Sequence, residues 1–376
     1  MAGIYIHIPF CKTRCVYCDF YTRTDLSKKS PYLDALCKEI GLVKDYLDGE
    51  VIKTIYLGGG TPSQLSINEL QIILSTLSDN FTINDDSEIT LEANPDDLNE
   101  EYVSALLDLG FNRLSMGIQS FNDTHLKYLN RRHSAQKAID AVKTSQQAGF
   151  KNISIDLIYG LPQQTMLDWT ESLNKAIDLN IQHISSYHLI YEEGTKLCRL
   201  LNSGKVKPVD EDTSLDMFSL MIDKLSEAGF IHYEISNFGK DRYFSRHNSS
   251  YWLDQKYLGL GPSAHSYNKT HRRLNVPSIA KYINGIESGS PEIEIERLDI
   301  DTRYNDFVLT GMRTMWGISA EKLMRQFGKK YLFYFEKNIQ KHIQAQTVIL
   351  INDTYKLTRK GIFISDSIMS DLMYIK

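Results

Sequence analysis

The sequence predicts an α/β protein built around a partial, TIM-like barrel of six β/α units, (β/α)6, with a small C-terminal α+β domain. Short runs rich in β-branched residues alternate with amphipathic stretches, which is typical of a parallel sheet. A glycine followed by a phenylalanine recurs before strand-like runs, at Gly110-Phe111, Gly149-Phe150 and Gly229-Phe230. Such a glycine can end a helix in a left-handed conformation before the next strand begins. Six units are too few for a closed eight-stranded barrel, so we expect a partial one.

The expected strands are spread over the first half of the chain, at 4–8, 54–57, 88–92, 113–118, 152–158 and 183–189. Leucine and isoleucine recur at helical spacing between them, for example across 33–47 and 70–77. The pattern weakens after about residue 239, and charge and proline rise around 288–301, as at a boundary. We therefore expect a barrel at 1–240, a connecting segment at 241–298, and a C-terminal domain at 299–376 with short helices and a hairpin of 348–351 with 355–358.

The composition is that of an ordinary globular protein of 376 residues, 42% hydrophobic and 24% charged, with a formal net charge of −5. A negative charge gives no general attraction for nucleic acid, and the tail lacks a basic recognition helix, so we expect no nucleic-acid partner. The first residues lack a basic region followed by a long apolar run, and no apolar stretch approaches the length of a membrane span. We expect a cytoplasmic protein. Peripheral contact with a membrane stays open, as does the oligomeric state.

Three cysteines, Cys11, Cys15 and Cys18, follow the first expected strand with the spacing C-x3-C-x2-C. A [4Fe–4S] cluster usually takes four thiolates, so three leave one iron free to bind a small molecule and pass it an electron. Zinc held by these thiolates and His7 is an alternative. A disulfide framework suits the chain less well, because five cysteines are an odd number. The spacing resembles the signature of the radical S-adenosylmethionine (SAM) enzymes, which implies a [4Fe–4S] cluster with SAM at its open iron.

Glycine-rich and polar segments follow the other expected strands. Gly58-Gly59-Gly60 would let a ligand approach the main chain closely, although three glycines also suit a tight turn. Glu92 could accept hydrogen bonds from ribose hydroxyls or an ammonium group, or could be a surface glutamate. Gln119, Arg131 and Asp156 could bind SAM or a second polar ligand, or could form a network at the barrel mouth. Because chemistry gathers at the carboxyl ends of strands in parallel β/α folds, we expect these residues to share one site.

Longer motifs surround these residues: Tyr5-x-His7-Ile8-Pro9-Phe10-Cys11, Tyr17-Cys18-Asp19-Phe20, Gly58-Gly59-Gly60-Thr61-Pro62, Met116-Gly117-Ile118-Gln119-Ser120-Phe121-Asn122, Asn130-Arg131 and Asp156-Leu157-Ile158-Tyr159-Gly160-Leu161-Pro162. They resemble the radical SAM group that contains the oxygen-independent coproporphyrinogen III dehydrogenase HemN and the heme chaperone HemW. They cover roughly the first 190 residues, and the tail resembles the C-terminal domain of HemN. The resemblance implies that SAM is bound by Tyr5, Tyr17, Gly59, Gly60, Thr61, Glu92, Gln119, Arg131 and Asp156.

Two departures distinguish this chain from the dehydrogenase. Phe20 stands where the dehydrogenase has a fourth cysteine, and only ten residues precede Cys11, where the dehydrogenase has a longer segment. The run His247-Asn248-Ser249-Ser250-Tyr251-Trp252 also resembles the H-N-x-x-Y-W motif associated with heme binding in HemW. The resemblance therefore implies a heme-binding chaperone that delivers heme to acceptor proteins and does not oxidise coproporphyrinogen. The alternatives are radical SAM decarboxylation of coproporphyrinogen III in porphyrin synthesis, and a zinc-stabilised barrel that serves as a binding module.

The H-N-x-x-Y-W segment supplies the expected heme residues. His247 is the leading candidate ligand, because an imidazole can ligate heme iron, and Tyr251 and Trp252 offer flat surfaces to the macrocycle. His247 and Tyr251 are four residues apart and would share one face of a helix. A histidine that is packed and hydrogen-bonded in a core is the alternative interpretation. Three other histidines near the expected barrel mouth could serve instead: His7, His188 and His265.

Overall fold

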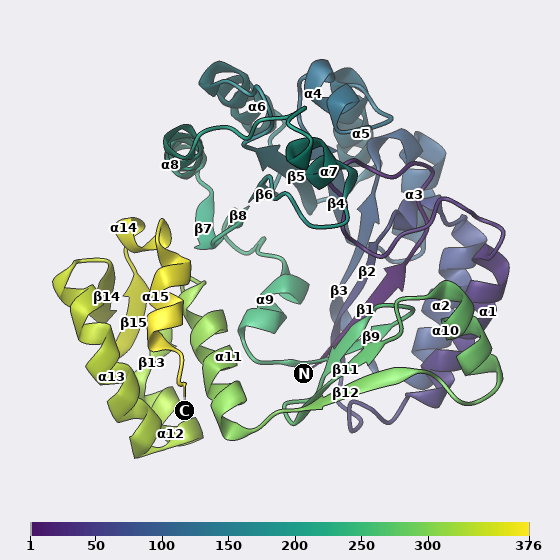
Figure 1. Ribbon diagram of the computed structural model, residues 1–376. Helices are drawn as coiled ribbons and strands as arrows, with labels where there is room; N and C mark the ends of the chain where they lie inside the picture. The colour runs from purple at the N-terminus through teal and green to yellow at the C-terminus, as the bar shows by residue number, and fades with distance from the viewer. Residues whose placement is uncertain (1, 376) are drawn as a thin grey trace.

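Six parallel strands form the centre of the main sheet in the computed structural model, which describes residues 2–375 (Figure 1). They pair in chain order, and each coincides with one of the expected strands. Every residue of the first strand except Tyr5 is buried, as in a parallel strand that is covered on both faces. The partial (β/α)6 fold is therefore confirmed. The strands are β1 (Ala2–Ile8), β2 (Ile52–Gly59), β3 (Ile83–Ala93), β4 (Arg113–Gln119), β5 (Ile153–Tyr159) and β6 (His183–His188).

All but the first of the α-helices in this part of the chain begin at a residue whose side chain caps the helix. Ser66 and Glu69 form a capping box at the start of α2, in which each side chain accepts from the other residue's backbone N–H. Gly149 ends α5 with a φ of 120°, which confirms the expected left-handed helix end. The helices are α1 (Lys29–Leu42), α2 (Ile67–Asn80), α3 (Glu100–Asp108), α4 (Asp123–Tyr128), α5 (Ala135–Ala148), α6 (Met166–Asp178), α7 (Lys196–Asn202) and α8 (Glu211–Glu227), with short 3-10 turns η1 (Pro62–Gln64) and η2 (Pro95–Asp97).

The sheet continues beyond both outer parallel strands. At one edge β8 pairs antiparallel with β6, and β7 pairs with β8; at the other, β9 runs parallel to β1, and β10, β11 and β12 follow antiparallel. Residues 241–298, which we expected to connect two domains, thus add four strands to the main sheet. The divisions at 240 and 298 remain a proposal. The added elements are β7 (Ile231–Glu234), β8 (Asn237–Gly239), α9 (Arg246–Trp252), β9 (Lys256–Leu260), β10 (His265–Tyr267), β11 (His271–Asn275), α10 (Ile279–Glu287) and β12 (Ile293–Arg297).

The C-terminal part has its own apolar core and a small antiparallel sheet in the order β13-β15-β14. Asn352 and Asp353 join β14 to β15 with φ values of 45° and 64°, as in the left-handed turns that two-residue hairpins favour. The expected helices and hairpin are therefore confirmed. The elements are α11 (Ile300–Met312), β13 (Ile318–Ser319), α12 (Ala320–Phe327), α13 (Lys329–Gln344), β14 (Val348–Ile351), β15 (Thr354–Leu357), α14 (Arg359–Ile362) and α15 (Ser365–Leu372).

The C-terminal part contacts the main sheet at both of its extended edges (Figure 1). The Met315 N–H donates to the carbonyl of Tyr233 on β7, 2.9 Å away, and Arg272 of β11 forms an ion pair with Asp306 of α11. The ion pair holds α11 beside the edge that carries β9 to β11, and the Met315 hydrogen bond ties the segment after α11 to the opposite edge. Within residues 2–375, no helix has both the length and the apolar character needed to cross a membrane.

Candidate functional site

The cysteine loop lies at the carboxyl end of β1 and is tied back to that strand. The Cys11 N–H donates to the Arg23 carbonyl at 3.0 Å, and the Arg23 N–H donates to the Pro9 carbonyl at 2.7 Å. Cys11 is buried, whereas Cys15 and Cys18 are half-buried, and all three thiols are free. They line one pocket of about 390 Å³ at the mouth of the barrel. The loop therefore presents its three sulfur atoms to a common space.

Two hydrogen-bond donors lie against these sulfur atoms. The Thr61 hydroxyl donates to Cys11 Sγ at 3.2 Å, and Arg131 Nη1 donates to Cys15 Sγ at 3.4 Å. Arg131 Nη2 also donates to the Gly117 carbonyl, while its buried Nε has no hydrogen-bond partner among residues 2–375. Burial raises the pKa of the Cys11 thiol, and the Thr61 hydrogen bond offsets this effect only in part. Once the sulfur atoms ligate a metal as thiolates, both donors can bond to them.

The glycine loop after β2 packs directly on the cysteine loop. The Gly60 N–H donates to the Ile8 carbonyl at 2.7 Å, and the Thr61 N–H donates to the Phe10 carbonyl at 2.8 Å. A Cβ atom at Gly60 would lie 2.7 Å from the first of these oxygens and 2.8 Å from the second, closer than real contacts allow. Glycine is therefore required at this position by the close approach of two backbone segments.

Glu92, at the end of β3, is held by two donors from β2. The Tyr56 hydroxyl donates to Oε1 at 2.8 Å, and the Gly59 N–H donates to Oε2 at 3.0 Å. Burial raises the pKa of Glu92 to about 7, and the nearby charge of Asp156 adds to this effect. Burial also raises the pKa of Asp156 to about 6. The pocket thus holds two carboxyl groups whose charge changes near neutral pH.

The structure brings together most of the residues that we expected around SAM. Tyr17 and Gln119 line the same pocket as the three cysteines, and Gln119 has a φ of 69°, in the left-handed region. Tyr5 is the exception, because its ring lines a different pocket and its hydroxyl is hydrogen-bonded to His7 Nδ1 at 3.1 Å. Over residues 2–375, no three His, Cys, Asp or Glu side chains converge as they would around a single metal ion.

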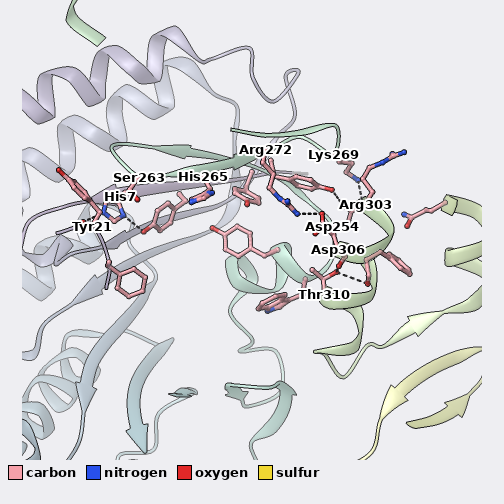
Figure 2. Close-up of a pocket in the computed structure, with 18 of the residues that line it drawn as sticks. His7, Tyr21, Asp254, Ser263, His265, Lys269, Arg272, Arg303, Asp306 and Thr310 are labelled. Carbon is pink, nitrogen blue, oxygen red and sulfur yellow. Dashed lines mark hydrogen bonds and ion pairs between the residues drawn. The ribbon is translucent and has the colours of Figure 1, made fainter. Parts of the chain in front are cut away.

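A second and larger pocket, of about 770 Å³, lies between the main sheet and the C-terminal part. Figure 2 shows His7 and Tyr21 at one end, Lys269 and Arg303 toward the other, and Arg272 between them. The basic end also carries acidic partners, since Arg272 pairs with Asp306 and Glu296, and Lys269 lies 3.7 Å from Asp254. The Arg303 side chain is exposed and forms no hydrogen bond or ion pair with residues 2–375.

Aromatic rings form the walls of this larger pocket. On the sheet side they come from α9, β9 and β10, and on the C-terminal side from α11 and the end of α12. Trp252 packs under the Arg313 guanidinium, 5.3 Å from the ring centre, and its buried indole N–H has no hydrogen-bond partner among the described residues. The wall residues are Tyr251, Trp252, Tyr257, Tyr267, Phe307 and Phe327.

His247 lies on α9, as expected, but its ring is buried behind the pocket wall. Nδ1 is hydrogen-bonded to the Thr54 hydroxyl and Nε2 to the Tyr251 hydroxyl, each at 2.8 Å. Burial lowers the pKa of His247 to about 3, so the ring is neutral. Because both ring nitrogens are occupied, this conformation leaves none free for iron. The ring is packed and hydrogen-bonded, as the alternative interpretation describes, and the assignment of His247 as a heme ligand stays a prediction.

The other three histidines differ in their surroundings. His7 is buried, with Nδ1 bound to the Tyr5 hydroxyl and Nε2 2.8 Å from the Tyr21 carbonyl. His188 lines the smaller pocket and lies 3.2 Å from the Ser214 hydroxyl. His265 lines the larger pocket, is exposed, and forms no side-chain hydrogen bond with residues 2–375.

Comparison with known proteins identifies the family. Residues 5–176 match the radical SAM superfamily, and residues 298–364 match the HemN C-terminal domain. The heme chaperone HemW of Lactococcus lactis is 32% identical over 98% of this chain and 96% of its own, and that of Bacillus subtilis is 34% identical over 88% of each. The chain belongs to the HemW family of radical SAM proteins.

A further relative supports the same family, and a solved structure shows the same fold. HemW of Mycobacterium tuberculosis is 35% identical over 85% of this chain and 84% of its own. The solved structure of coproporphyrinogen III oxidase, HemN, from Escherichia coli shares the fold, with a TM-score of 0.86 over 99% of this chain and 90% of that one. At 23% identity, this likeness concerns the fold alone.

Membership of the radical SAM superfamily implies a [4Fe–4S] cluster and SAM, and the smaller pocket fits both. Three free thiols, two of them with hydrogen-bond donors, match the ligands that such a cluster needs. A glycine loop with close backbone contacts, and the partly buried carboxyl of Glu92 beside it, match a polar ligand with an ammonium group and hydroxyls. The zinc-stabilised binding module is therefore set aside in favour of the family's cofactors.

Two groups of residues were not foreseen from the sequence. Asp97, in η2, accepts from Ser63 at 2.9 Å, Arg132 at 3.1 Å and Lys12 at 3.3 Å, and so links the cysteine loop, the glycine loop and the segment after β4. The sequence contained one indication of this role, because the acidic pair Asp96-Asp97 follows the end of an expected strand. Apart from Tyr251 and Trp252, the aromatic and basic residues of the larger pocket were also missed, because they come from segments far apart in the chain.

Proposed function

We propose that this HemW-family protein binds heme in the larger pocket and delivers it to acceptor proteins. The observation that supports heme binding is the shape and lining of that pocket. Its volume of about 770 Å³ lies within the range of roughly 300–1,000 Å³ that is usual for ligand clefts. Aromatic walls suit a flat macrocycle, and basic side chains at one end suit its propionates. The printed name of the relatives, heme chaperone HemW, supports the delivery step.

In this proposal Cys11, Cys15 and Cys18 hold a [4Fe–4S] cluster. When bound, such a cluster supplies an open iron and an electron for the reductive cleavage of SAM. The chain's own residues hold and orient these groups. Thr61 and Arg131 donate to two of the ligating sulfur atoms, and the arginine also adds positive charge beside an anionic cluster.

SAM lies next to the cluster, against the glycine loop and Glu92. The backbone of Gly59 and Gly60 lets the ligand approach without side chains in the way. The Glu92 carboxylate accepts from hydroxyls or an ammonium group once it is ionised. Gln119 and Asp156 complete the polar wall of the same pocket.

Decarboxylation of coproporphyrinogen III is the rival function, and the position of Phe20 disfavours it. The ring stands where the dehydrogenase has a fourth cysteine, and it is 62% exposed between the two pockets, which it lines together with Asp19. We expect no protoporphyrinogen when the reconstituted protein is incubated anaerobically with SAM, a reductant and coproporphyrinogen III. Product formation at the rate of a purified dehydrogenase run in parallel would support the enzyme instead.

The test of the chaperone function is anaerobic reconstitution followed by heme titration and transfer. The wild-type protein should contain iron and sulfide and should bind heme saturably. It should also transfer heme to a purified apo-haemoprotein faster than heme-loaded albumin does. Each of the variants Cys11→Ala, Cys15→Ala and Cys18→Ala should lose the iron–sulfur absorption. If the wild-type protein shows no saturable heme binding, the proposed function is wrong.

A further inference from the structure

The face of the sheet around β10 is built like one wall of a ligand site. His265 and Tyr267 are two residues apart on β10, so their side chains point to the same face. Tyr267 pairs with Tyr257 of β9 on one side and with Arg272 of β11 on the other, which places these side chains on that face as well. An imidazole, two phenols and a guanidinium therefore share one surface, and all four line the larger pocket.

The imidazole of His265 is in the form that binds a metal. Its side chain is exposed to the pocket, and it makes no hydrogen bond with any residue from 2 to 375. Partial burial and, to a smaller degree, the charge of Arg272 lower the pKa of His265 below its ordinary value. A lowered pKa favours the neutral ring, in which one nitrogen has a lone pair available.

The opposite wall complements this face. Phe307 of α11 and Phe327 of α12 line the pocket from the C-terminal side, 5.3 Å apart between ring centres. Arg303 lies one turn before Phe307 on the same helix and has no ionic partner among the described residues. Figure 2 shows Arg303 and Lys269 together at the end of the pocket beyond His265. The apolar wall suits a macrocycle, and the two cations, of which Lys269 is shared with Asp254, suit its carboxylates.

The contacts of His247 indicate a structural role, in which it orients Tyr251. Its ring is 1% exposed, and withdrawing Nε2 toward a ligand would leave the Tyr251 hydroxyl without its acceptor or donor. The two rings meet edge to face, 5.1 Å apart, and Tyr251 then meets Tyr257 in the same way at 4.6 Å. His247 therefore sets the orientation of a ring that lines the pocket.

We propose that His265 is the axial ligand of heme iron in the larger pocket, and that His247 is a positioning residue that fixes Tyr251. The inference rests on the proposed heme-binding function and names the residue that carries it.

The experiment is an anaerobic heme titration of the full-length, reconstituted protein, followed by absorption and EPR spectroscopy. His265→Ala should lose the imidazole-ligated spectrum and raise the Kd for heme by at least about tenfold, since even the loss of a partner behind a ligand costs that much. Added imidazole should restore the wild-type spectrum in this variant. His271→Ala is the matched control, because His271 lies on the neighbouring strand of the same hairpin and outside the pocket lining.

His247→Gln and Tyr251→Phe separate positioning from ligation. Both should keep the imidazole-ligated spectrum and bind heme a few-fold more weakly, because Tyr251 is then less firmly oriented. A wild-type spectrum and Kd in His265→Ala would overturn the inference while leaving the chaperone function intact. Loss of the imidazole signature in His247→Gln, with normal iron–sulfur content, would also overturn it and assign the iron to His247. Absence of saturable heme binding in the wild-type protein would overturn the function and the inference together.

Discussion

The guanidinium of Arg131 donates a hydrogen bond to the sulfur of Cys15, 3.4 Å away, although 116 residues separate them in the chain. The same side chain donates to the carbonyl of Gly117 on β4, so it joins the cysteine loop to the fourth strand. A thiolate that ligates iron gains from a charged donor, because such bonds contribute about 1.5–3 kcal/mol. Arg131 is therefore a structural link and an electrostatic partner of the proposed cluster.

We expect Arg131→Gln to retain less iron and sulfide after anaerobic reconstitution and to lose its cluster absorption faster in air. The glutamine keeps some polarity but cannot supply the positive charge beside Cys15. Arg132→Lys is the matched control, because Arg132 pairs with Asp96 and Asp97 and lysine preserves that charge. Equal cluster lifetimes in Arg131→Gln and the wild-type protein would contradict the proposed role.

Glu92→Gln should weaken SAM binding by about 1–3 kcal/mol, the usual cost of leaving a polar partner unsatisfied. The amide has one acceptor oxygen, and an NH2 donor replaces the second carboxylate oxygen, so the ligand loses a hydrogen bond that the carboxylate provides. Isothermal titration of the anaerobic protein with SAM measures this loss. Glu171→Gln, an exposed position on α6, removes the same charge far from the pocket and should bind SAM as the wild-type protein does. Unchanged affinity in Glu92→Gln would remove Glu92 from the SAM site.

The raised pKa of Glu92 makes the free energy of unfolding of the protein depend on pH. Burial lifts it from 4.5 to about 7 in the folded protein, so the folded state holds more protons than the unfolded chain within that window. The contribution of this carboxyl to the free energy of unfolding is therefore greatest below the unfolded pKa and falls as pH rises toward 7. The fall is at most about 3 kcal/mol.

Urea unfolding between about pH 5 and pH 8 tests this pH dependence. The wild-type protein should lose stability relative to Glu92→Gln as pH rises, since the amide has no proton to release. Parallel pH profiles for the two proteins would show that Glu92 titrates at an ordinary pKa.

Gly60→Ala should destabilise the protein by about 1–3 kcal/mol, as overpacking usually does. The added methyl group would meet the backbone oxygens of Ile8 and Phe10, so the glycine loop and the cysteine loop would be forced apart. Gly41→Ala is the control, because that position lies inside α1 and its nearest atom would be 3.8 Å away. Alanine there should be neutral or should stabilise the helix by about 0.5–1 kcal/mol. Equal thermal midpoints for Gly60→Ala and the wild-type protein would show that the loops separate without cost.

The six parallel strands could be predicted because each is a short apolar run between helical patterns. The edge strands could not, and β12 shows why: all five of its residues, Ile293–Arg297, are exposed, so burial leaves no pattern in its sequence. β11 pairs with it and carries Arg272 and Arg273, which read as a solvated segment. Such strands form because their backbones pair with a neighbouring strand, and this pairing leaves no periodic pattern of side chains in the sequence.

The candidate site also has a part that the sequence predicts and a part that it does not. Cys11, Glu92 and Asp156 could be placed together because the carboxyl ends of parallel strands must meet at one edge. The surroundings of His247 could not be inferred, since its ring is bound by Thr54, which lies on β2 and is 193 residues away. The larger pocket likewise depends on the ion pair that places α11 beside β11, and no motif in either segment indicates this contact.

Asp19 and Phe20 line both pockets, and this shared wall has a thermodynamic consequence. A ligand that moves the Phe20 ring from one pocket changes the room available in the other. The two occupants are then coupled, and the coupling is reciprocal: if SAM changes the affinity for a macrocycle by some factor, the macrocycle changes the affinity for SAM by the same factor. Under that condition, Phe20 would be the side chain through which binding in one pocket changes affinity in the other.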